Sequence, residues 1–289
     1  MDIPPVLVLG ATGRIGTILR KCWGRDRALW QTRAKAGLSD PEAGPDPGPD
    51  WVTLAPLEQP GALVRAASGV KVIICLAGVV PGRSGPVGNL SDNTALAEAA
   101  IRAGATVGAR VLLASSAAVY GYRAGVLDEA TPLAPRSNYG RAKAAMEIRA
   151  AALGGRLGVP VCALRIGNIA GIGAILGGWK PGFQLDRFDD GRTPRRSYIG
   201  MATLARVLGD LVARPDLPDV LNIASPGAVE MGALLEAAKL GWTPRPAPDS
   251  AVPEVVLSTR ALARFVTLPE TTRADALVAE WHALKETRP

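Results

Sequence analysis

The chain has 289 residues, of which 48% are hydrophobic and 20% are charged, and its formal net charge is +7. This composition supports a large buried core and excludes an intrinsically disordered chain. No apolar run approaches the roughly 18–20 residues of a membrane span, and the first residues lack the basic segment of a secretion signal, so we expect a cytoplasmic protein with no membrane partner. Its Lys and Arg residues are scattered singly, which argues against nucleic acid and favours a small polar or anionic partner.

Residues that commonly bind metals are sparse. The three cysteines, Cys22, Cys75 and Cys162, have neither a CxxC spacing nor an even number that could pair completely. The single histidine, His282, lies in a C-terminal helical pattern. We therefore expect no metal site, and cysteines that serve packing in a reducing compartment.

Short apolar runs alternate with helical patterns through the first half of the chain. The expected strands are 6–9, 28–32, 52–54, 70–76, 111–114 and 161–166. The expected helices are 14–22, 61–67, 92–103 and 139–153, and a Pro- and Gly-rich surface loop covers 37–50. Such alternation predicts right-handed crossovers, and therefore an α/β fold with a doubly wound parallel sheet.

After Ile166 the pattern becomes less regular. A Gly-rich stretch at 171–191 is expected to be a loop. The remaining expected elements are a helix at 201–213, a strand at 220–223 and a helix at 231–239.

A GxxGxxG pattern lies between the first expected strand and the first expected helix. Its residues are Gly10, Ala11, Thr12, Gly13, Arg14, Ile15 and Gly16. Glycine suits this place because a Cβ would block the turn and the approach of the backbone to a pyrophosphate, whose charge the helix N-terminus then receives. The pattern predicts dinucleotide binding, and the alternative is an ordinary tight turn.

The end of the second expected strand bears on the choice of cofactor. A carboxylate there would accept hydrogen bonds from the ribose 2′-OH of NAD, but the sequence reads Gln31-Thr32-Arg33. Because Arg33 can pair with a 2′-phosphate, NADP is favoured over NAD. The alternative is that Arg33 is a surface charge and that both cofactors are accepted.

Three side chains form a candidate acid–base group. Ser116 lies in a Ser-Ser-Ala-Ala-Val-Tyr-Gly segment that follows an expected strand, and Tyr139 and Lys143 are four residues apart on an expected helix. Residues at i and i+4 share a helix face, so the lysine charge is expected to lower the pKa of the phenol. Such a tyrosine can exchange a proton with a substrate oxygen to which the serine hydroxyl donates a hydrogen bond.

The order of these three motifs resembles the extended short-chain dehydrogenase/reductases, the NAD-dependent epimerase/dehydratase family that includes UDP-galactose 4-epimerase. The similarity runs from Val6 to about Leu235 and is looser in its second half. It implies a catalytic role for Ser116, an acid/base role for Tyr139, and a Lys143 that holds the nicotinamide ribose.

The same resemblance implies further site residues. Leu76, Ala77, Gly78, Asn93 and Ile166 match cofactor-binding positions of the family. Asn168 matches a position that faces substrate, and Arg196 one that contacts a substrate phosphate, with a plain surface arginine as the alternative. A homodimer through a bundle that includes the Tyr139 helix is also possible.

The resemblance divides the chain into two parts. Residues 1–168, to which 198–225 return, are expected to form a dinucleotide-binding Rossmann domain. Residues 169–197 and 226–289 are expected to form a small C-terminal substrate lobe.

The chain departs from the family in ways that affect the expected reaction. Ala117 and Ala118 stand where sugar dehydratases carry Asp-Glu, which disfavours dehydration. Only 27 residues (169–195) separate Asn168 from Arg196, so we expect a nucleotide-binding lobe that is short for a full UDP-sugar.

Three functions follow from these features. The favoured one is an NAD(P)-dependent oxidoreductase that acts on a hydroxyl or carbonyl carbon of a sugar-like or small polar substrate. The first alternative is an NAD-dependent nucleotide-sugar epimerase. The second is a cofactor-sensing protein without catalysis, against which the presence of both Tyr139 and Lys143 argues.

Overall fold

The computed structural model describes residues 5–24, 27–33, 50–80, 89–173 and 175–286. Its main element is a seven-stranded sheet in the order β12-β7-β5-β4-β1-β2-β3, in which every neighbouring pair is parallel. The strands are β1 Val6–Leu9, β2 Leu29–Thr32, β3 Trp51–Thr53, β4 Val72–Cys75, β5 Arg110–Ser116, β7 Val161–Ile166 and β12 Val220–Ile223. The predicted doubly wound parallel sheet is therefore confirmed, whereas residues 37–49 of the predicted loop at 37–50 lie outside the described residues.

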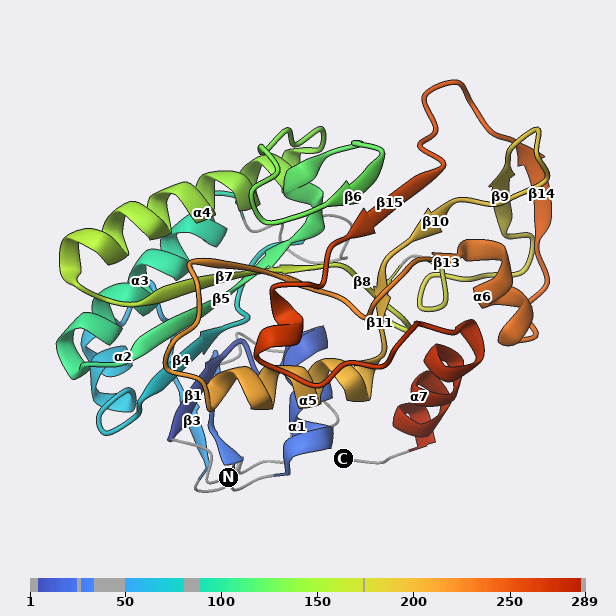
Figure 1. The fold of residues 1–289 in the computed structure, drawn as a ribbon. Helices are drawn as coiled ribbons and strands as arrows, with labels where there is room; N and C mark the ends of the chain where they lie inside the picture. The colour runs from blue at the N-terminus through green and yellow to red at the C-terminus, as the bar shows by residue number, and fades with distance from the viewer. Residues whose placement is uncertain (1–4, 25–26, 34–49, 81–88, 174, 287–289) are drawn as a thin grey trace.

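Helices cover both faces of this sheet (Figure 1). One face carries α2 Pro60–Ala66, α3 Asp92–Val107 and α4 Asn138–Leu157, and the other carries α1 Arg14–Trp23 and α5 Met201–Val212. Both sides of β1 are buried, because Leu7 and Leu9 pack in the α2–α4 core while Val6 and Val8 pack in the α1–α5 core. Strands that are buried on both faces need near-continuous apolar sequence, which is why these runs were recognisable.

The strand order reverses at β1, since β2 lies on one side of it and β4 on the other. In open α/β sheets the loops that leave such strands diverge and form a crevice at their carboxyl ends. Two segments leave the sheet at this place, namely the glycine loop after Leu9 and the 76–80 segment after Cys75. The fold therefore brings the predicted phosphate loop to the edge where ligands bind.

Short strands build three smaller sheets at the other end of the molecule (Figure 1). A mixed sheet contains β13 Val229–Glu230, β10 Arg195–Arg196, β15 Glu254–Leu257 and β6 Gly125–Leu127. Two parallel pairs join β8 Asn168–Ile169 to β11 Tyr198–Ile199, and β9 Gln184–Arg187 to β14 Thr243–Pro246. The helices here are α6 Met231–Ala237 and α7 Ala274–Glu286.

The 171–191 stretch is not wholly a loop. It contains β9, which pairs with β14 more than 50 residues later in the chain. The expectation was wrong at 184–187 because this strand has no apolar alternation and is stabilised by a distant partner. Within the described ranges, the helices are too short or too polar to cross a bilayer.

Candidate active site

A cavity of about 290 Å³ opens at the carboxyl ends of β1, β4, β5 and β7. Most of the predicted site residues line it, although they come from segments far apart in the sequence. These residues are Gly10, Gly13, Arg14, Ile15, Gly16, Leu76, Gly78, Ser116, Tyr139, Lys143, Ile166 and Asn168. The phosphate loop and the candidate acid–base group thus share one cavity.

Other predicted residues lie outside the cavity lining. Within the glycine loop, Ala11 is fully buried and Thr12 is exposed. Ala77 follows β4 and stands between two residues that line the cavity. Arg33 is exposed at the end of β2, the place expected for a residue beside the adenosine ribose.

The glycine loop is shaped by close backbone contacts. Gly10 has a φ of +83°, and a Cβ on it would lie 2.6 Å from the amide nitrogen of Ala77. A Cβ on Gly16 would lie 2.5 Å from the carbonyl oxygen of Ala11. The α1 helix that follows has no acidic residue in its first turn and no side-chain cap, so its positive end faces the cavity without a competing negative charge. This cradle fits the pyrophosphate of a dinucleotide.

Gln31 is a site-forming residue that sequence reasoning missed. Its side-chain oxygen accepts a hydrogen bond from the Gly10 amide at 2.8 Å, and its side-chain nitrogen donates to the carbonyl of Leu54 at 2.7 Å. The side chain is 2% exposed. The only signal in the sequence was a glutamine that follows apolar residues within an expected strand.

Ser116 and Tyr139 both line the cavity and lie close to each other. Ser116 ends β5, and its hydroxyl accepts a hydrogen bond from the Ala118 amide at 3.2 Å. Tyr139 lies in the first turn of α4, which Ser137 caps through a 3.0 Å bond from the Gly140 amide. Burial raises the pKa of the Tyr139 phenol, while the Ser116 hydroxyl, within hydrogen-bonding reach, and the charge of Arg14 lower it.

Lys143 lies deep in the site. Its amine donates to the carbonyl of Ala114 at 2.7 Å and lies 5.8 Å from the centre of the Tyr139 ring. Burial lowers the pKa of Lys143 to about 8, against the opposing effects of Cys75 and Glu147. The structure thus differs from the expected lowering of the Tyr139 pKa, because burial dominates at the phenol and the amine is directed to the β5 backbone.

Asn93 is buried beside the cavity wall. Its side-chain nitrogen donates to the carbonyls of Val79 and Leu90 at 3.1 and 3.0 Å, which fastens the segment after β4 to the start of α3. Its side-chain oxygen has no partner among the described residues and would lie 2.5 Å from a Cβ on Gly78. Gly78 is therefore required for this close approach.

The two predicted substrate residues have different surroundings. Asn168 lines the cavity and donates to the carbonyl of Ser197 at 3.2 Å. Arg196 is not part of the lining, and its guanidinium donates to the carbonyls of Arg195, Val252 and Pro253. In this structure Arg196 fastens the segment before β15 to β10.

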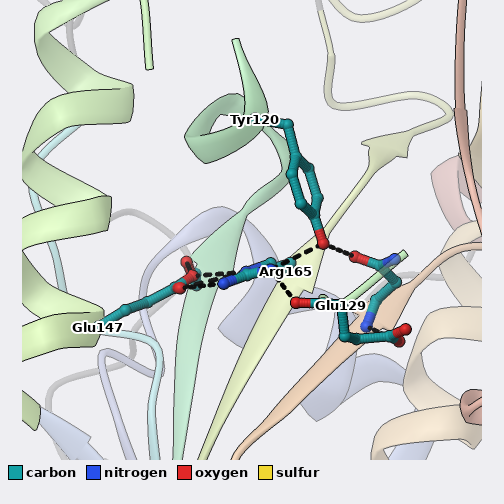
Figure 2. A network of polar contacts seen from close by, with 6 residues as sticks. Tyr120, Glu129, Glu147 and Arg165 are labelled. Carbon is teal, nitrogen blue, oxygen red and sulfur yellow. Dashed lines mark hydrogen bonds and ion pairs between the residues drawn. The ribbon is translucent and has the colours of Figure 1, made fainter. Parts of the chain in front are cut away.

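A buried polar network adjoins the cavity, whose lining includes Ser115, and Figure 2 shows its side chains. The Glu147 carboxylate pairs with the Arg165 guanidinium at 2.8 Å, and each side chain is only 6% exposed. Arg165 also donates to the Tyr120 hydroxyl at 2.9 Å, and that hydroxyl donates to Asn222 at 2.8 Å. On the other side, the Ser115 hydroxyl donates to Glu147. None of these residues was predicted to belong to the site.

Comparison with protein-family models identifies the chain. Residues 6–180, more than half of it, match the NAD dependent epimerase/dehydratase family. The chain belongs to this family. The resemblance inferred from the three motifs is thereby confirmed, whereas a search of curated proteins gives no significant match.

Solved structures with the same fold cover nearly the whole chain. A UDP-N-acetylglucosamine 4-epimerase from Methanobrevibacter ruminantium, in complex with UDP-N-acetylmuramic acid, is 19% identical with a TM-score of 0.75, over 99% of this chain and 100% of that one. The enzyme WbmG from Bordetella bronchiseptica, in complex with NAD, is 20% identical with a TM-score of 0.76, over 99% and 94%. DesIV, a dTDP-glucose 4,6-dehydratase from Streptomyces venezuelae, is 20% identical with a TM-score of 0.72, over 98% of both chains.

Proposed function

We propose that this chain is a nicotinamide-dependent epimerase that inverts a hydroxyl-bearing carbon of a nucleotide sugar. The observation that carries the proposal is the single cavity shared by the glycine loop and by Ser116, Tyr139 and Lys143. The loop would hold the pyrophosphate of a bound dinucleotide, and Tyr139 in the same cavity would transfer the proton in its reaction.

The comparisons favour the epimerase over the oxidoreductase that the sequence analysis put first. Solved structures with this fold include 4-epimerases, and one of them is described in complex with a UDP-sugar. The present chain covers all of that epimerase's length. The 27 residues between Asn168 and Arg196 therefore do not argue against a nucleotide-sugar substrate.

The proposed mechanism assigns one task to each reacting side chain. Tyr139 removes the proton of the substrate hydroxyl as the carbon is oxidised and returns it when the carbon is reduced from the other face. Ser116 donates a hydrogen bond to the same oxygen. Lys143, charged below its pKa of about 8, holds the nicotinamide ribose. The bound nicotinamide supplies reversible hydride transfer to and from the substrate carbon.

Dehydration is a less suitable reaction for this site. The residues after Ser116 are Ala117 and Ala118, which form the start of the single turn Ala117–Tyr120. Elimination of water from a sugar needs a base and an acid close to the neighbouring carbons, and alanine offers neither. The proposal therefore places this chain with epimerases rather than with dehydratases.

The cofactor is a separate part of the proposal. Arg33 at the end of β2 supports NADP, since its guanidinium can pair with a 2′-phosphate. NAD accompanies solved structures of this fold, which supports NAD instead. Fluorescence titration with NADH and NADPH decides between them, and Arg33→Ala should abolish any preference for NADPH. An unchanged preference in that variant would remove Arg33 from the cofactor site.

The function is tested by incubating the protein with UDP-N-acetylglucosamine or UDP-glucose and measuring the 4-epimer that forms. The nicotinamide cofactor that the purified protein retains is measured in parallel. Tightly retained cofactor and 4-epimer formation without added reductant are expected. Tyr139→Phe should lower the rate by about 10²–10⁴-fold while the protein still binds NADH. Reversible NADPH binding, together with oxidation of NADPH when a carbonyl substrate is added, would favour the reductase. Full function in Tyr139→Phe would instead favour the cofactor-sensing protein.

A further inference from the structure

The buried carboxylate of Glu147 connects the two elements that carry the proposed reacting residues. It accepts a hydrogen bond from the hydroxyl of Ser115, which immediately precedes Ser116 at the end of β5. Glu147 itself lies one helical turn beyond Lys143 on α4, on the same face of the helix as Tyr139. The side chain thus joins the strand of Ser116 to the helix of Tyr139 and Lys143.

Arg165 holds this carboxylate in one orientation (Figure 2). Its Nε atom lies 3.2 and 3.1 Å from the two carboxylate oxygens, and its Nη2 atom donates at 2.8 Å. The Nη1 atom points the other way, to the Tyr120 hydroxyl at 2.9 Å and to the carbonyl of Glu129 at 3.1 Å. A forked ion pair with further partners on its far side leaves the carboxylate little freedom to rotate.

The network also reaches the last strand of the sheet. Tyr120 ends the turn that begins after Ser116, and its hydroxyl donates to Asn222 on β12. The Asn222 side chain donates in turn to the carbonyls of Leu127 and Ser258, at 3.0 and 3.2 Å. The carboxyl ends of β5, β7 and β12 are therefore held in register behind the cavity.

Glu147 also has an electrostatic relation to Lys143. The groups that face the amine are the Cys75 thiol from β4, the Ala114 carbonyl from β5, and Tyr139, Met146 and Glu147 on its own helix. From the segment after β4 the neutral Gly78 lies beside the amine, since a Cβ on it would lie 3.4 Å from the Lys143 nitrogen, and the neutral Asn93 of α3 lies against the same glycine. Of these, Glu147 is the carboxylate, and it is held beyond the reach of solvent.

We infer that Glu147 is a positioning residue, which is oriented by Arg165, fixes Ser115 next to Ser116, and supplies the negative charge that faces the Lys143 amine. This inference rests on the proposed function, because it takes Lys143 to be the residue that holds the cofactor ribose. Glu147 touches neither cofactor nor substrate in this role, since it acts through Ser115 and Lys143.

The test is fluorescence titration with NADH between about pH 6 and about pH 9, on wild type and Glu147→Gln that have been freed of retained cofactor. Burial lowers the pKa of Lys143 to about 8 while Cys75 and Glu147 oppose it, so wild-type affinity should fall as the pH rises through that value. Without the carboxylate the fall should move to a lower pH, because the amine loses a negative charge that favours its protonated form. An identical midpoint in both proteins, or no pH dependence in wild type, would overturn the inference. A wild type that binds no NADH would overturn the proposed function instead.

Two further variants keep the test decisive. Glu147→Gln leaves Arg165 buried without a counter-ion, so the double variant Glu147→Gln/Arg165→Gln provides a neutral pair in case the single variant does not fold. Of this pair, Glu147 is the one that acts on the pKa of Lys143, so the double variant should also show the lower midpoint. A wild-type midpoint in the folded double variant would contradict the inference. The matched control is Glu98→Gln, which removes the surface pair with Arg149 and should keep the wild-type midpoint.

Discussion

The side chain of Gln31 and the amide of Gly10 form a 2.8 Å hydrogen bond that fastens the glycine loop to β2. The other end of the same side chain is bonded to the carbonyl of Leu54, just after β3. The backbone carbonyl of Gln31 also accepts from the Ala11 amide at 3.1 Å. One buried residue thus sets the distance between the phosphate loop and two strands of the sheet.

Replacement of Gln31 by leucine should therefore affect both stability and cofactor binding. Gln31→Leu keeps the volume but leaves two buried backbone groups unpaired, so we expect the free energy of unfolding to fall by about 1–3 kcal/mol. NADH affinity should fall as well, because the loop loses its tether. Urea denaturation and NADH titration measure the two effects. Gln184→Leu, at an exposed position of β9, should change stability by less than about 0.5 kcal/mol, and equal losses in the two variants would contradict the prediction.

Gly16 and Gly155 form a second matched pair, since both are helical glycines with different surroundings. A Cβ on Gly16 would meet the Ala11 backbone at 2.5 Å, whereas a Cβ on Gly155 would meet nothing within 4 Å. Gly16→Ala should weaken NADH binding about tenfold or more, because the loop backbone has to shift. Gly155→Ala should stabilise the protein by about 0.5–1 kcal/mol through helix propensity alone. Thermal unfolding and NADH titration test both, and unchanged NADH affinity in Gly16→Ala would contradict the close contact.

The main sheet was predicted well because each of its strands is marked by its own local sequence. Strands buried on both faces require short apolar runs, and the cores on the two faces of the sheet contain alternate residues of the same strand. The small sheets were not predicted. β14 reads Thr-Pro-Arg-Pro and is exposed along its whole length, so neither propensity nor alternation marks it as a strand. Its pairing with β9 is set by the tertiary fold.

The same distinction applies to the candidate site. Motif order and spacing predicted Ser116, Tyr139 and Lys143, and the structure brings them to one cavity. Arg165 was not predicted, because a buried ion pair is visible only once β7 and α4 are packed together. The spacing of Glu147, four residues after Lys143, was the one available signal for it.

The burial of Lys143 makes a prediction about stability and pH. Its pKa is lowered from 10.5 to about 8 in the folded protein, so between these values the unfolded chain binds more protons. Stability from this group therefore rises with pH in that window. The free energy of unfolding of wild type minus that of Lys143→Met should increase by up to about 3 kcal/mol from pH 8 to pH 10.5. The difference between the two proteins is the quantity to measure, because burial raises the pKa values of Cys75 and Tyr139 and destabilises both proteins at high pH. A constant difference would show that Lys143 is not desolvated.

Arg14 offers a direct test of the electrostatics at the acid/base residue. Its guanidinium donates to the carbonyl of Ile172 at 2.7 Å, and it lines the same cavity as Tyr139. Burial raises the pKa of Tyr139 and the Ser116 hydroxyl and Arg14 lower it, so Arg14→Met should raise that pKa further. The rise of kcat with pH should then move to higher pH, by a modest amount because the guanidinium is exposed to screening. The pH–rate profile of 4-epimerisation measures it, with the exposed Arg102→Met on α3 as a control that keeps the wild-type profile. Coincident profiles for Arg14→Met and wild type would mean that this charge does not reach the phenol.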